Sequence, residues 1–263
     1  MISIIIGFYK RLNYLELIFQ SMEAQSDKSF EVIIAEDNDA TETVDFINLS
    51  RKKYSFHIKH VSQPDLGFLK TKILNTAIKV ANGDKLVFID GDCILHKHFV
   101  KEYQKAINPS VFCYGRRAMI SEAFTQKILA ENSIAAINYF SLLKSGGQWM
   151  AAAIYIPWKI NQHKQHRRIL GCNWGVTKVN ILKVNGFDED YQKAGVGEDF
   201  DIDWRLKKLG IKCFSMKNKA IVYHMHHPPN YSAQDTAFVE QMMENKIKAG
   251  EYFCSNGIIK NSK

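Results

Sequence analysis

The sequence predicts an α/β fold built on a mostly parallel central sheet with helices on both sides. Short runs of β-branched residues, at 2–6, 31–35 and 56–61, alternate with segments of helical periodicity. The runs 2–6 and 31–35 are largely apolar at consecutive positions, as strands are when helices cover both faces of a sheet. A strand, a helix and a second parallel strand, repeated in this way, require right-handed crossovers.

The elements of the first half follow one another in a regular order. After the first strand, the segment 14–25 repeats its apolar residues with a helical period. The next two strands lie on either side of a polar stretch. The amphipathic segment 68–81 then predicts a second helix, which leads through an Asn-Gly-Asp turn into the strand 85–89.

Strands and helices alternate less regularly in the second half of the chain. A further strand is expected at 111–115, a long helix at 122–143 and an amphipathic helix at 234–249. The segment 158–168 is too basic for a core and is expected to form an exposed loop. Because neither an internal repeat nor a linker interrupts the chain, we expect a single domain over residues 1–263.

Composition limits the classes of protein that the chain can represent. It has 263 residues, of which 46% are hydrophobic and 24% charged, enough for one substantial core. No run approaches 18 apolar residues, so no transmembrane helix is expected. The apolar N-terminal run lacks a preceding charge and a cleavage pattern, which favours a core strand over a signal peptide. The five scattered cysteines contain no CxxC pair and favour reduced thiols in the cytosol.

The chain is basic, with a formal net charge of +8 and a pI near 9.1. A positive surface favours anionic partners such as phosphates, anionic lipid headgroups or nucleic acid. A lysine-rich soluble surface explains the same charge, and composition alone does not separate the two.

Two carboxylates stand at the end of the fourth predicted strand. Asp90 and Asp92 follow an apolar run, and residues two apart in an extended chain point the same way. Ligands of open α/β sheets bind at this edge, and paired carboxylates suit Mg²⁺ or Mn²⁺, which bind diphosphates. Asp-Gly is also a common turn pair, and taken alone the motif favours a simple turn; its place after an apolar strand makes the two interpretations about equal.

Four motifs in one order extend this observation. They are the first strand with its turn, SIIIGFYKR; a strand closing on acids, EVIIAEDNDATET; a loop opening a helix, PDLGFLKTKILNTAIKVANGD; and the strand end LVFIDGDC. Together they span about 95 residues. This half of the chain resembles the nucleotide-binding half of inverting family 2 glycosyltransferases, which have the GT-A fold with its Rossmann-like first half.

The resemblance implies a role for each acid. Asp37 contacts the base of a nucleoside diphosphate sugar, with uracil expected; Asp90 lies near the ribose and metal; and Asp92 ligates Mn²⁺ or Mg²⁺. Lys72 stands where the family usually has an arginine, and it keeps the charge but loses the bidentate fork. The turn Gly7-Phe8 replaces the usual Pro-Thr.

The segment 171–210 resembles the acceptor side of β-1,4-galactosyltransferases and of chondroitin-polymerase-type enzymes. It has a glycine-rich entry, the run NGFDE and then Gly-Glu-Asp opening a helix. The resemblance implies Asp199 as catalytic base and Glu198 as a ligand of donor or acceptor hydroxyls. Those galactosyltransferases carry a mobile tryptophan just before Gly-Glu-Asp; here AGVG stands there, so other residues are expected to close over the donor, with Trp174 a candidate. The two halves are then 1–115, binding the nucleotide sugar, and 116–263, binding the acceptor.

The chemistry of inversion explains why an acid belongs at this place. One base removes the proton of the acceptor hydroxyl as it attacks the anomeric carbon, while a metal neutralises the departing diphosphate. Acids at the start of a helix also complement its dipole, and this purely structural explanation accounts well for Asp201 and Asp203.

Three histidines follow a late strand in the run AIVYHMHHPPN. In an extended chain His224 and His226 share a face and His227 points away. Related enzymes place a metal-binding histidine after a late strand, and His224 matches that position. A zinc site and a solvated loop are the competing interpretations.

The leading hypothesis is a metal-dependent inverting glycosyltransferase that moves a hexose or N-acetylhexosamine from a UDP-sugar to a glycan or glycolipid acceptor. Surface-polysaccharide synthesis of a bacterial type, without nucleic acid as partner, is the expected setting. The alternatives are a non-catalytic module that binds polyanions or membranes and a sugar nucleotidyltransferase. We expect a cytoplasmic protein, with the basic loop 158–168 and the tail 258–263 in contact with anionic lipid at the inner face of the plasma membrane.

Overall fold

The computed structural model describes residues 1–158, 168–193, 197–228 and 233–260. Its strands are β1 (Ile2–Phe8), β2 (Phe30–Glu36), β3 (His57–Ser62), β4 (Lys85–Asp90), β5 (Cys93–Leu95), β6 (Val111–Tyr114), β7 (Arg116–Met119), β8 (Trp174–Thr177), β9 (Lys212–Ser215) and β10 (Ile221–His224). Its helices are α1 (Leu12–Glu23), α2 (Thr41–Lys53), α3 (Lys70–Val80), α4 (Phe99–Ala106), α5 (Glu122–Ala130), α6 (Tyr139–Lys144), the short η1 (Met150–Ala152), α7 (Lys178–Lys183), α8 (Glu198–Lys208) and α9 (Ala233–Ala249).

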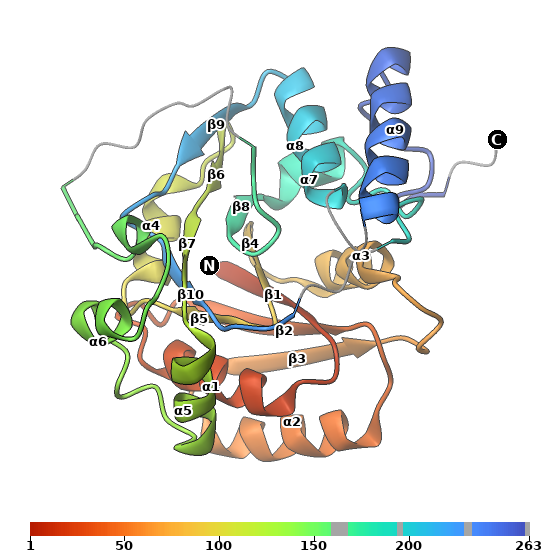
Figure 1. Cartoon of the computed structure of the whole chain (residues 1–263). Helices are drawn as coiled ribbons and strands as arrows, with labels where there is room; N and C mark the ends of the chain where they lie inside the picture. The colour runs from red at the N-terminus through yellow and green to blue at the C-terminus, as the bar shows by residue number, and fades with distance from the viewer. Residues whose placement is uncertain (159–167, 194–196, 229–232, 261–263) are drawn as a thin grey trace.

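Seven strands form the main sheet, in the order β3-β2-β1-β4-β8-β6-β9. β1 pairs in parallel with β2 and β4, and β2 pairs in parallel with β3. β8 is antiparallel to both β4 and β6, whereas β6 and β9 are parallel. The sheet is therefore mostly parallel, as predicted, and strands from both halves of the sequence take part in it (Figure 1).

A second, three-stranded sheet has the order β5-β10-β7. β10 is antiparallel to β5 and parallel to β7. Its register sets His224 opposite Cys93 on one side and opposite Met119 on the other. This small sheet brings the chain just after β4 next to a strand from the far end of the sequence, which matters for the site.

The core lies on both faces of the main sheet. In β1, Ile4 and Ile6 belong to the apolar cluster on one face, and Ile5 belongs to the cluster on the other. All three side chains are fully buried. Figure 1 shows α1 and α2 on one side of the sheet and α3, α7 and α8 on the other, which explains why the strands are apolar at consecutive positions.

The predicted helix 122–143 is divided in the structure into α5 and α6. After α5 the chain turns at Asn132, whose φ of 45° lies in the left-handed region that ends helices. α6 then begins at a new cap, where the Asn138 side chain accepts a hydrogen bond from the backbone N–H of Ser141. Periodicity predicted the helical segments, and local capping by asparagine divided them.

Helix α2 was missed, because only a narrow face of it is buried. Thr43, Ile47 and Ser50 are buried, and the rest of the helix is polar.

In the part of the chain described here, no helix combines the length and the apolar character needed to cross a membrane.

Candidate active site

The site lies at the carboxyl edge of the parallel strands. The register sets Gly7 beside Asp90 and Phe8 beside Glu36, so the chain leaves β1, β2 and β4 at the same level. The absence of a side chain at Gly7 matters here, because a Cβ would lie 3.3 Å from Cε of Lys70. Gly91 donates its N–H to the Gly7 carbonyl at 2.9 Å, which ties the Asp-Gly-Asp turn to β1.

Asp37 is buried just after β2, where it was expected. Its Oδ1 accepts a hydrogen bond from the Gln63 side chain at 2.7 Å, and its Oδ2 accepts one from the backbone N–H of Leu69 at 2.8 Å. Leu69 precedes the first residue of α3, so this carboxylate also fixes the start of that helix. Each oxygen retains a further lone pair for a ligand.

Asp92 lies between two histidines and forms with them a candidate metal centre. Oδ1 of Asp92 is 3.3 Å from Nε2 of His224, and Oδ2 is 2.9 Å from Nε2 of His227. One potential ligand atom from each of the three residues lies within 4.8 Å of the others. β5 and β10 produce this convergence, because Met225 donates its N–H to the carbonyl of Asp92 at 2.9 Å.

Both imidazoles are oriented as metal ligands are. Nδ1 of His224 lies 2.9 Å from the carbonyl of Met225, and Nδ1 of His227 lies 2.8 Å from the carbonyl of Pro228. A carbonyl only accepts, so the network places a proton on each Nδ1 and leaves each Nε2 of the neutral rings as a lone pair. A backbone partner on the second nitrogen is the usual support of a metal-binding histidine.

Three groups that present lone pairs to one another require a positive charge among them. Burial alone raises the pKa of Asp92, but the hydrogen bond from His227 and the charges of both histidines lower that pKa to about 2. The hydrogen bond to Asp92 correspondingly raises the pKa of His227. A proton on His227 can supply the charge, and a divalent cation bound to the same atoms would displace it.

The histidine assignment made from the sequence needs one correction. His224 lies in the cluster as expected, but His227 joins it and does not point away. β10 ends at His224, so the alternation of an extended strand no longer applies three residues later. His226 forms hydrogen bonds through its backbone instead: its N–H donates to the Thr125 hydroxyl, and its carbonyl accepts from the Tyr14 hydroxyl.

Lys70, and not Lys72, is the cation of the acidic cluster. Nζ of Lys70 lies 2.9 Å from Oδ1 of Asp90 and 3.2 Å from Oε1 of Glu198. Burial opposes its charge, yet Asp90 and Glu198 hold the pKa of Lys70 well above its ordinary value. Lys72 is exposed, because two residues along a helix turn the side chain to the opposite side.

Asp199 has the surroundings of a general base. It lies in the first turn of α8, where Oδ2 accepts a hydrogen bond from the N–H of Gly171 at 2.9 Å and Oδ1 one from the N–H of Phe200 at 2.9 Å. Burial and the neighbouring charge of Glu198 raise the pKa of Asp199 to about 7, against the opposing effect of Lys70. A carboxylate with this pKa is half-ionised near neutral pH, which suits proton transfer.

A small cavity of about 10 Å³ lies among these charged groups, enough for roughly one water molecule. It is lined by Lys70, Asp90, Gly171, Trp174, Glu198 and Asp199, among others. The predicted ribose-side acid and the predicted base therefore line one space.

Trp174 does not have the position of a mobile lid. It lies in β8, is 1% exposed and stacks on Phe88 with ring centroids 4.5 Å apart. Its ring also packs edge-on against Phe187. Trp174 is a core residue beneath the cavity, so closure over a donor cannot be assigned to it.

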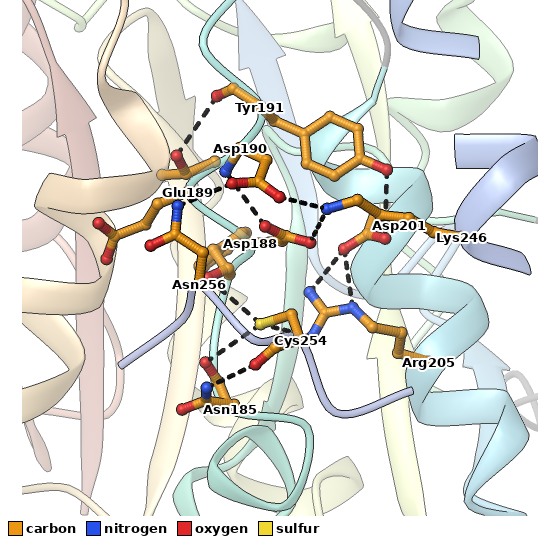
Figure 2. Close-up of polar contacts among 12 residues, drawn as sticks. Asn185, Asp188, Glu189, Asp190, Tyr191, Asp201, Arg205, Lys246, Cys254 and Asn256 are labelled. Carbon is orange, nitrogen blue, oxygen red and sulfur yellow. Dashed lines mark hydrogen bonds and ion pairs between the residues drawn. The ribbon is translucent and has the colours of Figure 1, made fainter. Parts of the chain in front are cut away.

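A buried polar network anchors the helix that carries Glu198 and Asp199 (Figure 2). Nε of Arg205 donates to Asp201 at 2.7 Å, and Nη1 donates to the carbonyls of Val184 and Gly186 at 2.6 and 2.9 Å. Arg205 is fully buried. The network thus fixes α8 to the loop after α7.

Helix α9 holds the same loop from the other side. Lys246 pairs with Asp188, and its Nζ also lies 2.8 Å from Oδ2 of Asp190. Asn185 donates from its side chain to the carbonyl of Cys254 at 2.7 Å. The run NGFDE therefore supports the site from outside, through contacts that sequence spacing did not predict.

The predicted membrane-facing segments fall mostly outside the described residues. Residues 159–167 of the basic loop and 261–263 of the tail belong to the part of the chain on which the structure gives no description. Contact with a membrane and a cytoplasmic location therefore stay predictions.

Comparison with known protein families assigns this chain to one of them. The model of glycosyl transferase family 2 matches residues 3–170, well over half of the chain. The chain belongs to this family. A second model, described as the N-terminal domain of galactosyltransferase, matches residues 157–228, the region of the predicted acceptor side.

Curated relatives are distant. Validoxylamine A glucosyltransferases from two subspecies of Streptomyces hygroscopicus are 21% identical over 231 residues, which is 80% of this chain. The matches cover 52% and 49% of the two relatives, so the chain spans about half their length.

Solved structures of glycosyltransferases share the GT-A fold with this member of family 2. TarS of S. aureus is 17% identical with a TM-score of 0.63, over 94% of this chain and 39% of TarS. A mannosyltransferase from Pyrobaculum calidifontis, solved with GDP-Man and Mn²⁺, is 13% identical with a TM-score of 0.64, over 94% and 64% of the two chains. GalNAc-T7, solved with UDP, GalNAc and Mn²⁺, is 13% identical with a TM-score of 0.66, over 96% and 49%.

Replacement of Arg205 by methionine should destabilise the family 2 domain by about 3–5 kcal/mol, because Asp201 would remain buried without its counter-charge. Urea denaturation followed by circular dichroism measures this. Lys208→Met, at an exposed position of the same helix, is the control and should change the stability by less than about 0.5 kcal/mol. An equal urea midpoint for Arg205→Met and wild type would contradict the anchoring role.

Proposed function

We propose that this family 2 protein is a metal-dependent inverting glycosyltransferase that moves a hexose or N-acetylhexosamine from a UDP-sugar to a glycan or glycolipid acceptor. One observation carries the proposal. A carboxylate with a pKa near 7, Asp199, shares a cavity with Asp90, and two residues after Asp90 lies a cluster able to hold a divalent cation. Base and metal are the two groups that inversion requires. Synthesis of a bacterial-type surface polysaccharide is the setting we propose.

The transfer exchanges one bond for another. The acceptor oxygen forms a bond to the anomeric carbon while the bond from that carbon to the diphosphate oxygen breaks, and its electron pair leaves with the diphosphate. Asp199 takes the proton of the acceptor hydroxyl. When bound, the metal neutralises the charge that appears on the diphosphate. Glu198 and Lys70 form an ion pair beside the base, where they can orient sugar hydroxyls.

The donor set favours Mn²⁺ over Mg²⁺. Two imidazole nitrogens and one carboxylate oxygen suit a first-row transition metal, whereas Mg²⁺ prefers an octahedron of oxygens. Two of the structures with a similar fold were solved with Mn²⁺. Zinc accepts the same donors, and competition between the ions distinguishes the two.

The two alternative functions explain fewer features of the site. A polyanion- or membrane-binding module needs positive charge, but it needs neither a base with a pKa near 7 nor a metal centre. A sugar nucleotidyltransferase pairs carboxylates with a metal, but the family match over residues 3–170 favours a glycosyltransferase. The segment GFYKRLNY, which ends β1 and follows it, is also not a glycine-rich phosphate loop.

Asp199→Asn should abolish transfer while donor binding survives, because the amide keeps the shape of the carboxylate and loses its basicity. We expect a loss of about a hundred- to ten-thousand-fold in sugar transfer. Release of UDP from a panel of UDP-sugars with Mn²⁺ gives the rate, and calorimetry gives the affinity for UDP. Asp203→Asn, on the same helix, is the control. If wild type binds no UDP and releases none from any donor, the proposed function fails.

Activity should fall as the pH drops through about 7, because protonated Asp199 cannot accept the proton of the acceptor. Glu198→Gln removes the neighbouring negative charge that raises the pKa of Asp199, so the midpoint of the acidic limb should move to lower pH. The profile of kcat/KM against pH measures the midpoint, whatever the change in its height. A midpoint that stays fixed in this variant would assign the limb to another group.

His227→Ala should weaken Mn²⁺ binding at least about tenfold, since the variant retains only Asp92 and His224 of the cluster. His226→Ala is the matched control, because the hydrogen bonds of His226 are made by its backbone. Electron paramagnetic resonance of free Mn²⁺ measures the affinity without any substrate. Equal affinity in His227→Ala and wild type would remove His227 from the site.

A further inference from the structure

Arg117 is a cation of the site with few polar partners among the described residues, and the charge of Asp90 acts on it only from beyond ion-pair distance. Its Nε is buried without a hydrogen-bond partner, and its Nη1 has only a long contact of 3.9 Å with the sulfur of Cys172. No ion pair of Arg117 occurs among the residues that the structure describes. An unpaired guanidinium in a half-buried position is costly, so its presence calls for an anion that binds there.

The strand register places Arg117 beside the candidate metal centre. β7 pairs with β10 so that Arg117 lies opposite Val222 and Met119 lies opposite His224. Side chains two residues apart share a face, so Arg117 lies on the same face as His224, about 7 Å along the strand. The contact with Cys172 brings the guanidinium next to Gly171, whose N–H binds Asp199.

Trp149 holds the guanidinium from the outer side. The Arg117 Cζ lies 5.5 Å from the centre of the Trp149 ring. The preceding residue, Gln148, exchanges two backbone hydrogen bonds of 3.0 Å with Met119 of β7. Trp149 itself has a φ of 55° and is 59% exposed, so a large ring is held at the surface in a backbone conformation that tryptophan rarely adopts.

We propose that Arg117 binds the diphosphate of the nucleotide-sugar donor and stabilises the charge that the diphosphate gains as it leaves. The inference rests on the proposed function. Asp92 offsets half of the charge of a divalent cation, and a diphosphate ester carries one negative charge on each phosphate. The summed charge of Asp92, the cation and the diphosphate is thus negative. It becomes more negative when the bond between the anomeric carbon and the diphosphate oxygen breaks.

Arg117 is the described basic residue best suited to offset this charge. Lys70 already pairs with Asp90 and Glu198, whereas Arg117 is unpaired and its planar fork matches phosphate oxygens. Because the charge on the diphosphate grows during the reaction, the interaction is stronger in the transition state than with the bound donor. Trp149 acts as a positioning residue that keeps the guanidinium plane in place.

The test compares Arg117→Gln, Arg117→Lys and the matched control Arg116→Gln. Arg116 lies next to Arg117 on β7 but faces the other way, with its guanidinium 4.7 Å from the Tyr114 ring centre. The measurements are the affinity for UDP with Mn²⁺, the release of UDP from UDP-sugars in water without acceptor, and the KM for acceptor. Circular dichroism and thermal melting establish that each variant is folded.

We expect Arg117→Gln to slow UDP release about a hundred- to a thousand-fold and to weaken UDP binding less than that. Arg117→Lys should recover part of the rate because it keeps the charge without the fork, and Arg116→Gln should match wild type. If UDP release and UDP affinity are unchanged in both Arg117 variants, the proposal is overturned. It is equally overturned if only the KM for acceptor changes, which would place Arg117 in an acceptor subsite.

These outcomes distinguish failure of the proposed function from failure of the role proposed for Arg117. Wild type that neither binds UDP nor releases it from a donor would refute the proposed function. Wild type that does both, together with Arg117 variants that do so equally well, would refute only the role of Arg117.

Discussion

The site depends on the pairing of β5 with β10. β5 begins directly after Asp92, and its antiparallel register brings His224 and the start of the segment beyond β10 onto the same carboxylate. The three side chains come from two distant parts of the chain, and neither part forms a site without the other. Because the three groups present lone pairs to one another, the strands hold together atoms that repel unless a proton or a metal lies among them. A metal bound to these three groups would therefore be linked to folding at this point.

A second charge balance separates Asp199, the proposed base, from its neighbours. Lys70 pairs with Asp90 and Glu198, and it lies near Asp199 without a direct ion pair to it. A direct ion pair would lower the pKa of Asp199 and make it a poor base. Instead burial and the charge of Glu198 raise the pKa to about 7, while the backbone of Gly171 and Phe200 fixes both oxygens. Glu198 and Asp199 thus have different electrostatic surroundings, because only Glu198 forms an ion pair with Lys70.

The sequence predicted the acids of the site better than its cations and histidines. Asp37 directly follows β2 and Asp92 lies two residues after β4, and the carboxyl ends of these parallel strands lie at the same edge of the sheet. Lys72 was chosen in place of Lys70, because which side of a helix faces a site depends on how the helix is rotated, and sequence spacing alone does not fix that rotation. His227 was missed because the strand it follows ends at His224, a boundary set by pairing and not by composition. Trp174 was taken as a lid, whereas its partner Phe88, on a neighbouring strand, makes it core.

The position of Asp199, the proposed base, depends on tertiary contacts. Glu198 and Asp199 begin α8, and a helix start alone determines neither depth nor rotation. The buried Arg205 determines both, since it joins Asp201 to the carbonyls of the loop after α7. Proton transfer requires the carboxylate within hydrogen-bond distance of the acceptor hydroxyl, and small displacements lower the rate steeply. Arg205, six residues after Asp199 on α8, therefore positions the proposed base without lining the cavity itself.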